Sequence, residues 1–417
     1  MEDNIPHVNT EAIEVLFDPF VPGLTADPYA HYARWRRTAS VLWGAAPESS
    51  GSGCWYVLGY AAAREALSDD RLGLEFHRVV PAEALPPPAP QFSSFMELIR
   101  SWFIFRDPPD HTRLRKLFAP AFAGQRSKEQ LPVVQSITRR LLEGLKDRRE
   151  IDIIADFARP LPVRVIGHLL GIPDTDFDVL QQWSDALLQG IDLKRATDVE
   201  AAYGAATVAA QELHQYLHDL LIQRRRAPRG DILSGVCATG ECSDSELIAN
   251  CALLLFAGHE TTVNLIGNGV LALLRNPGQL QLLRAAPELV PGAVEELLRY
   301  DSPSQMTFRY AMHPCSLAGH PLSPGEPVGI VIGAANHDEA QFANPATLDI
   351  RRSPNRHLSF GNGRHTCLGG ALARAEGCAA LGQLVATFPT IELAPQALSW
   401  SPSLGLRGLS RLLVEVA

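Results

Sequence analysis

The sequence has little lysine, no basic excess and no long apolar run. Lysine occurs at only four of 417 positions, and the net charge of -9 argues against a nucleic-acid partner. The hydrophobic runs fall far short of the roughly 20 residues that span a membrane. The polar, acidic N-terminus lacks the charged-then-apolar pattern of a secretion signal. We therefore expect a soluble cytoplasmic protein without a membrane anchor.

The seven cysteines follow no spacing typical of a disulfide framework. Their number is odd and they are scattered along the chain, which favours a reducing compartment. No Cys-x-x-Cys or His-x-x-x-His pair stands near Cys367, so a zinc site, which needs about four ligands, lacks candidates there.

Cys367 lies in a glycine-rich stretch, Phe360–Glu376, that reads FGNGRHTCLGGALARAE. Glycine permits tight turns and close backbone approach. An Ala-rich helical pattern follows, and the amino end of a helix favours a thiolate. Arg364 and His365 add positive charge. The pattern describes a deprotonated sulfur held against a large flat group, with cations available for carboxylates. A haem with an axial thiolate fits it; a small buried core cysteine is the simpler alternative.

A second stretch predicts a long buried helix. Ser243 and Glu246 form a capping-box pattern, and helical residues continue to Asn276, just before a proline. About 32 residues at 1.5 Å each give roughly 48 Å, enough to cross the molecule. Its apolar middle runs into the sequence AGHETT at 257–262.

The polar groups at 258–262 suit proton delivery. A carboxylate in an apolar helix is costly unless it has a partner or a function. We expect Gly258 to let the helix open locally and free a carbonyl, with Glu260 and Thr261 supplying an acid and a hydroxyl beside the gap. A buried glutamate paired with an arginine, next to a flaw at glycine, is the alternative.

The segment DPPDHTRLR at 107–115 predicts a helix that begins near Asp110. His111 and Arg115 share one face at i and i+4, where two cationic donors can hold a carboxylate. A solvated basic turn is the commoner meaning of such a cluster. Residues 72–106 lack periodicity but are rich in aromatics; we favour a lid over an apolar pocket rather than a poorly packed linker.

Short strands complete the predicted architecture. Residues 55–58 and 302–310 are expected to be extended, and 317–331 to form short strands with Gly and Pro turns. Residues 126–225 are helical in pattern, with a junction between two helices at 190–197.

Four ordered motifs resemble those of the bacterial-type soluble cytochrome P450 family. They are F-G-x-G-x-H-x-C-x-G at 360–369, AGHETT, DPPDHTRLR and the pair Glu296-x-x-Arg299. The resemblance covers about residues 18–416 and implies a mainly α fold with small β-sheets, a triangular prism with a long central helix across the haem. It implies one domain over 1–417, in which a β-rich part at roughly 18–70 and 305–335 packs on the helices. His337 and Leu348 replace the usual Arg and Phe of the family, and we expect no effect on the fold.

The resemblance also implies roles for individual residues. Cys367 is expected to ligate the iron of haem b, and Glu260 and Thr261 to be the catalytic residues that deliver protons. The expected cofactor-binding residues are His111, Arg115, Ala257, Gly258, Arg309, Phe360, Gly361, His365, Cys367 and Gly369, of which the two arginines and two histidines would anchor the propionates. The expected substrate contacts are Trp102, Phe103, Leu253, Met306, Leu404 and Leu406. Glu296 and Arg299, with Arg352, are expected to be structural.

The function implied is that of a haem-thiolate monooxygenase with O2 as co-substrate. We expect it to oxidise, chiefly by hydroxylation, a medium-to-large apolar molecule such as a terpenoid, steroid, fatty acid or polyketide. No flavin or nicotinamide fingerprint is present, so a ferredoxin and its NAD(P)H-dependent reductase are expected to supply electrons to a monomeric enzyme. Arg113, Lys116, Arg364 and Arg374 are a candidate basic patch for docking the ferredoxin.

Two alternatives remain. A same-family enzyme can perform epoxidation, desaturation or oxidative coupling with the same proton-delivery residues. A haem-based ligand binder or sensor without turnover is a different class, but it needs no acid–threonine pair and usually carries an output domain.

Overall fold

The computed structural model describes residues 17–46, 53–80, 89–192 and 198–417. The α-helices are α1 (Pro28–Thr38), α2 (Tyr60–Ser68), α3 (Ser93–Arg100), α4 (Asp110–Phe118), α5 (Gly124–Glu143), α6 (Pro160–Leu170), α7 (Phe177–Ile191), α8 (Val199–Arg226), α9 (Ile232–Cys237), α10 (Asp244–Arg275), α11 (Pro277–Ala285), α12 (Val290–Tyr300), α13 (Ile332–Ala335) and α14 (Gly370–Thr387). The strands are β1 (Val41–Gly44), β2 (Cys54–Val57), β3 (Leu72–Gly73), β4 (Glu150–Asp152), β5 (Thr307–Ala311), β6 (Cys315–Leu317), β7 (His320–Leu322), β8 (Pro327–Ile330), β9 (Ile391–Leu393) and β10 (Leu413–Val416). The predicted class, mainly α with small sheets, is confirmed.

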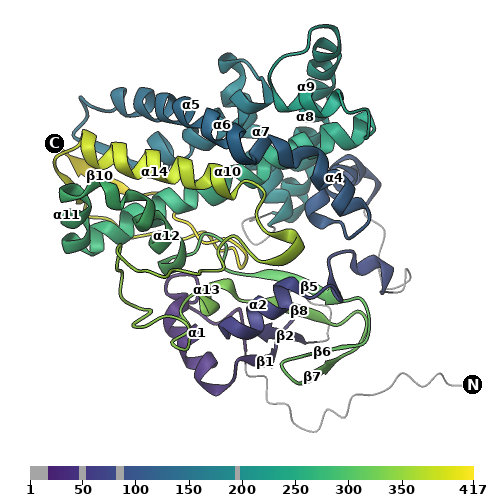
Figure 1. Cartoon of the computed structure of the whole chain (residues 1–417), viewed down its shortest axis with the longest axis horizontal. Helices are drawn as coiled ribbons and strands as arrows, with labels where there is room; N and C mark the ends of the chain where they lie inside the picture. Colours follow the sequence, from purple (N-terminus) through teal and green to yellow (C-terminus); the bar gives the residue numbers. More distant parts are fainter. Residues whose placement is uncertain (1–16, 47–52, 81–88, 193–197) are drawn as a thin grey trace, which may run out of the picture.

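A five-stranded sheet joins the N-terminal segment to the region after α12. Its strand order is β1-β2-β8-β5-β3, with β2 and β8 parallel and the other neighbours antiparallel. Apolar clusters cover both faces of the central strands. Figure 1 shows this sheet, with α1, α2 and α13 beside it, on one side of the helical part. The predicted extended segments at 55–58 and 302–310 correspond to β2 and β5.

The central helix α10 has the predicted bounds. Ser243 and Glu246 form both bonds of the capping box, and the helix runs for 32 residues before Pro277. It packs against α6, α7, α8, α12 and α14. The helix is buried on all sides because its sequence is apolar on every face through most of its length. α10 is therefore a buried axis that positions the residues at its centre.

Two predictions of local structure were incomplete. Within 126–225 the structure contains β4 and a π-helix (Ile153–Ala158). β4 forms because it pairs with the C-terminal strand β10 in a three-stranded sheet. Within 72–106, α3 is a helix whose Phe95 and Leu98 are buried. The proline run of that segment and most of the junction after α7 lie outside the described residues.

The two departures from the expected sequence pattern are accommodated. His337 is buried, and its Nε2 lies 2.8 Å from the carbonyl oxygen of Tyr300 while its ring stacks on Tyr29. Leu348 is buried in the main apolar core. Among the described residues, no helix is both long and apolar enough to cross a membrane.

Candidate active site

The loop that carries Cys367 leads directly into α14. Gly361 and Gly363 have φ of 71° and 73°, a left-handed conformation that glycine adopts without strain. At Gly363 a Cβ would lie 2.6 Å from the carbonyl oxygen of Leu67, so glycine is also required by the close approach of α2. The turn places the Cys367 amide 2.8 Å from the carbonyl oxygen of Phe360, which fixes the cysteine just before the helix.

The Cys367 side chain is accessible, although protein surrounds it. Burial raises the pKa of the thiol, whereas the Gly369 amide and the charges of Arg115 and Arg374 act to lower it. Because burial dominates, these neighbours alone do not ionise the sulfur. A metal ion deprotonates a thiol that coordinates it, so the environment fits a ligand on the wall of a cofactor site.

α10 is buried along most of its length but is accessible at its centre. Phe256, Ala257, Gly258 and Thr261 are partly exposed, whereas residues 247–255 and 262–273 are buried. A Cβ built on Gly258 would meet no other atom within 4 Å, and the same holds for Gly369. α14 packs against α10, and Thr262 of α10 lies beside Glu376 of α14, so these two segments are neighbours. Together they leave room for a flat group between α10 and the cysteine loop.

His111, Arg115, Arg309 and His365 lie together, as predicted for residues that anchor one group. The rings of His111 and His365 are 4.1 Å apart. Burial, followed by the charges of Arg309 and His111, lowers the pKa of His365 to about 2. Arg309 is also buried, which lowers its pKa to about 10. Arg115 NH2 donates to the carbonyl oxygen of Thr366 at 2.6 Å and so joins α4 to the cysteine loop.

This cluster carries buried donors without matching acceptors. Within the described part of the chain, neither ring nitrogen of His111 has a hydrogen-bond partner, nor does Nε2 of His365. Arg309 donates to the neutral oxygens of Thr307 and Phe308, at 3.1 and 2.7 Å. Buried positive charge is costly unless an anion pairs with it. The donor set fits the two propionates of a haem, and binding by these residues remains a prediction.

The predicted hydroxyl of Thr261 is at the accessible centre of α10, and the predicted acid, Glu260, is buried beside it, but the helix does not open at Gly258. α10 is uninterrupted, which corrects the predicted local opening. Thr261 Oγ1 donates to the carbonyl oxygen of Ala257 at 3.0 Å, and close packing on both sides holds the helical path. Glu260 is buried, and its neighbour His259 bonds Ser184 of α7 through Nδ1 at 3.0 Å.

The predicted substrate contacts divide into separate groups. Trp102 and Leu253 are buried in the main core, and the Trp102 ring centre lies 5.0 Å from that of Phe256 on α10. The amide of Phe103 bonds Asn250 Oδ1 at 2.8 Å, which fastens this segment to α10 as well.

Leu404 and Leu406 are half-buried on a loop that pairs with residues 304–306. The Met306 side chain instead packs in the apolar cluster with Leu24, Tyr32 and Leu42. A substrate contact by Met306 stays a prediction.

Phe105 belongs to the aromatic segment that the sequence predicts as a lid, whereas its neighbour Ile104 was missed. Ile104 and Phe105 are 38% and 36% exposed, unusual for large apolar side chains next to a buried core. Phe105 stacks on Trp102, which contacts Phe256 at the accessible face of α10. Their place directly before the DPPDHTRLR motif was the signal that could have identified Ile104 as well.

The predicted basic patch is largely neutralised by ion pairs. Arg113 pairs with Glu246, Arg364 with Asp70 and Arg374 with Glu295. The patch is therefore weaker than the sequence indicates, because each of these cations faces a carboxylate that is distant in the chain.

The Glu296–Arg299 pair is structural, as predicted. Both side chains are 0% exposed and form two bonds of 2.8 Å. Arg352 Nε adds a 3.0 Å bond to Glu296. Arg299 also donates to the carbonyl oxygens of Asn336 and Pro345, so the network holds the long irregular segment that precedes the cysteine loop.

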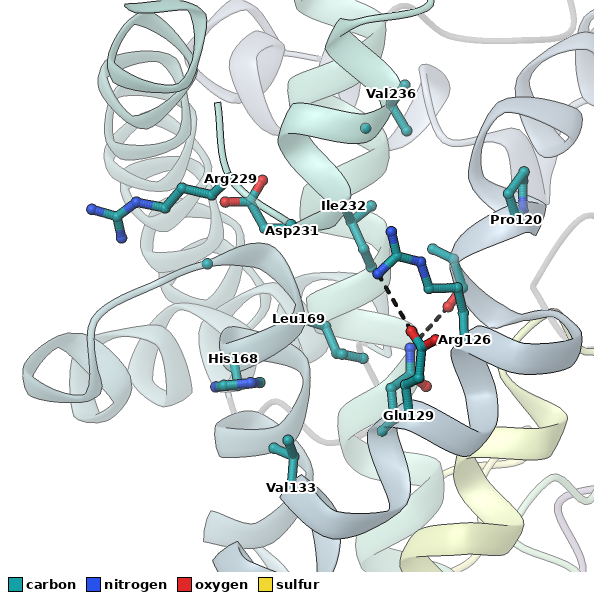
Figure 2. A pocket seen from close by; sticks show the side chains of 15 residues that line it. Pro120, Arg126, Glu129, Val133, His168, Leu169, Arg229, Asp231, Ile232 and Val236 are labelled. Carbon is teal, nitrogen blue, oxygen red and sulfur yellow. Dashed lines mark hydrogen bonds and ion pairs between the residues drawn. The ribbon is translucent and has the colours of Figure 1, made fainter. Parts of the chain in front are cut away.

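A surface cleft of about 440 Å³ lies between α5, α6 and α9 (Figure 2). Arg126, Glu129 and His168 are among its lining residues, and Arg126 pairs with Glu129 at 3.6 Å. None of the site residues described above lines this cleft. The predicted site residues are therefore separate from this cleft, at the centre of α10 and in the cysteine loop.

A thiol held before a helix, opposite an acid and a hydroxyl on a buried central helix, is the arrangement of haem-thiolate oxygenases. The family model described as Cytochrome P450 matches residues 90–397, and the chain belongs to the cytochrome P450 family. The biotin biosynthesis cytochrome P450 of Bacillus subtilis is 36% identical over 93% of this chain and 95% of its own length. The 6-deoxyerythronolide B hydroxylase of Saccharopolyspora erythraea is 37% identical over 95% of this chain and 99% of its own length.

Solved structures agree with the family and the fold. The structure of P450BioI in complex with an acyl carrier protein that carries hexadec-9Z-enoic acid matches with a TM-score of 0.87 and 35% identity, over 94% of this chain and 100% of that chain. The chain is thus a cytochrome P450 monooxygenase, an oxidoreductase whose family binds haem b and uses O2. When bound, haem supplies the redox-active iron that activates O2.

Proposed function

We propose that this enzyme hydroxylates a medium-to-large apolar small molecule, such as a fatty acid, polyketide, steroid or terpenoid. The observation that carries the proposal is the apolar wall at the accessible centre of α10. Phe256 is partly exposed there, and Ile104 and Phe105 present apolar surface beside it. Apolar walls with few polar groups suit a ligand of this type. Epoxidation, desaturation and oxidative coupling are compatible with the same wall.

In this proposal each catalytic residue has a defined task. Cys367 Sγ would hold the haem iron, and Arg115, Arg309, His111 and His365 would hold the propionates through charge-assisted bonds. Glu260 and the Thr261 hydroxyl would supply protons at the accessible centre of α10. The buried surroundings of α10 limit the access of bulk water, which reduces the loss of those protons to solvent.

Electrons are proposed to come from NAD(P)H through a ferredoxin reductase and a ferredoxin. Lys116 is an exposed cation on α4, and it is the most available member of the basic patch. A monomeric, cytoplasmic enzyme of one domain belongs to the same proposal. The seven free cysteines support a reducing compartment.

Ligand-induced difference spectra test the substrate class. Purified holoenzyme is titrated with a panel that contains fatty acids, steroids, terpenoids and macrolactones, and each hit is incubated with a surrogate ferredoxin and reductase. The panel also contains a carrier-protein-bound fatty acid, because the structure of one relative contains such a complex. A saturable spectral change with a hydroxylated product supports the proposal. Binding restricted to polar compounds contradicts it.

Cys367→Ala tests the ligand assignment. The reduced carbon monoxide complex of the wild-type enzyme is expected to show the thiolate-type band, and the variant should lose it. If the band survives in the variant, another residue is the ligand and the assignment fails.

A further inference from the structure

An arginine of α14 packs against the cysteine loop. The Arg374 guanidinium lies 4.3 Å from the centre of the Phe360 ring, a distance at which a cation is attracted to the aromatic face. Phe360 in turn holds the Cys367 amide through its carbonyl oxygen, at 2.8 Å. Arg374 is therefore connected to Cys367 through a single residue, Phe360.

One carboxylate holds Arg374 in place. Glu295 of α12 accepts from Nε at 2.6 Å and from NH2 at 3.0 Å, the two-point geometry that fixes a guanidinium most firmly. Its side chain is 28% exposed and that of Arg374 is 44% exposed. Solvent therefore weakens the attraction between the two charges, but the two hydrogen bonds still fix the guanidinium.

Glu295 also fixes the other end of the loop through His357. The Ser359 amide donates to His357 Nδ1 at 3.2 Å, so the ring proton is on Nε2. Nε2 then donates to Glu295 Oε2 at 3.1 Å. The His357 ring centre lies 5.8 Å from that of Phe360. Glu295 thus contacts the two groups that lie against Phe360.

The charges of this group reach the cysteine. Burial acts to raise the pKa of Glu295, but the hydrogen bonds from His357 and Arg374 outweigh it and lower the pKa to about 2. Glu295 is therefore ionised at neutral pH. Arg374 also donates through Nη1 to the Gly370 carbonyl oxygen at 3.4 Å, three residues after Cys367, so its positive charge lies near the sulfur and favours the thiolate. A negative charge bonded to Arg374 cancels part of that effect.

We propose that Glu295 is a positioning residue that sets the charge at the Cys367 thiolate by holding Arg374 against Phe360 and neutralising it. This inference rests on the proposed role of Cys367 as the haem ligand. Reduction of the bound haem adds one negative charge, so positive charge near the sulfur favours the reduced form and raises the midpoint potential.

Two single substitutions should then act in opposite directions. Glu295→Gln leaves Arg374 uncompensated and should raise the potential. Arg374→Gln leaves Glu295 uncompensated and should lower it. The double variant removes both charges and should return close to the wild-type value. Glu295→Asp keeps the charge and should rescue most of the effect of Glu295→Gln.

Mediated redox titration of the substrate-free holoenzymes measures these shifts without any protein partner. The control is Glu392→Gln on β9, which removes the same charge from an exposed site. By the helical rise, the end of α14 at Thr387 lies roughly 20 Å from Arg374, and Glu392 follows beyond that end. Opposite shifts in the single variants, with near-cancellation in the double variant, support the proposal.

Shifts of the same sign in both single variants, or shifts no larger than that of Glu392→Gln, overturn it. The reduced carbon monoxide spectrum is recorded for every protein. If the wild-type enzyme lacks the thiolate-type band, the ligand assignment fails. If only the variants lose the band, Glu295 acts by holding the loop together and the charge-setting role is rejected.

Discussion

Thr261 and Ala257 are joined across one turn of α10, where the threonine hydroxyl donates to the alanine carbonyl at 3.0 Å. A threonine in a helix commonly makes this bond to its own backbone. The bond holds the hydroxyl beside Gly258, where the helix is accessible. Delivery of its proton therefore requires the hydroxyl to release the carbonyl, without any opening of the helix.

The first prediction concerns Thr261→Ala. The variant should retain haem, because within the described residues the hydroxyl bonds only its own helix, but product formation should fall by roughly 10²-fold as proton delivery is lost. Electrons should then leave as hydrogen peroxide. Product and peroxide are measured per NAD(P)H consumed, with Thr261→Ser as the control that keeps the hydroxyl. Full coupling in the alanine variant would rule out the relay role.

The second prediction concerns haem retention by Arg115. Arg115→Met removes a half-buried cation of the propionate cluster and its 2.6 Å bond to Thr366. Loss of one charge-assisted hydrogen bond, worth about 1.5–3 kcal/mol, should speed haem loss roughly 10- to 100-fold. Transfer of haem to an excess of apomyoglobin measures the rate. Arg113→Met is the matched control, because it lies on the same helix and pairs with Glu246 at the surface; equal rates in the two variants would contradict the assignment.

The third prediction concerns the stability of the Glu296 network. Glu296→Gln leaves Arg299, which is 0% exposed, without its charged partner. Removing one member of a buried pair costs about 3–5 kcal/mol. The melting temperature of the holoenzyme should fall well below that of Glu288→Gln, which alters an exposed residue. Similar melting temperatures would show that the buried network contributes little.

The sequence predicts those parts of the site that follow local rules. The capping box and the following proline define α10, and the motif spacings place Cys367, Thr261 and the propionate cluster. Pairings between distant segments are not encoded locally. β4 and β10 are joined across more than 250 residues, and such contacts leave no periodic trace in either segment.

The ion pairs are a second example. Arg364 meets Asp70 from 294 residues away, and Arg374 meets Glu295 from 79 residues away. A sequence shows which cations lie near Cys367, but it does not show which carboxylates neutralise them. The alternation after α12 does hold, because Met306 and Phe308 both pack in the N-terminal apolar cluster.

The last prediction concerns Glu376, a carboxyl buried between α14 and α10. It is 3% exposed, and burial raises its pKa to about 8, although a bond with Thr262 acts to lower it. In the unfolded chain a glutamate has a pKa of about 4.3. Between these two values the folded protein binds one more proton than the unfolded chain. Stability should therefore fall as pH rises from about 5 to 8, and the full penalty should be present above pH 8.

Glu376→Gln removes this titration while it keeps the shape of the side chain. The melting temperature of the variant relative to wild type should therefore rise between pH 5 and pH 9, because only the wild-type protein must then bury a charge. Glu392→Gln, which alters an exposed carboxylate of β9, should show no such trend. A difference that stays constant with pH would mean that Glu376 is ionised in the folded protein throughout, with a partner strong enough to offset its burial.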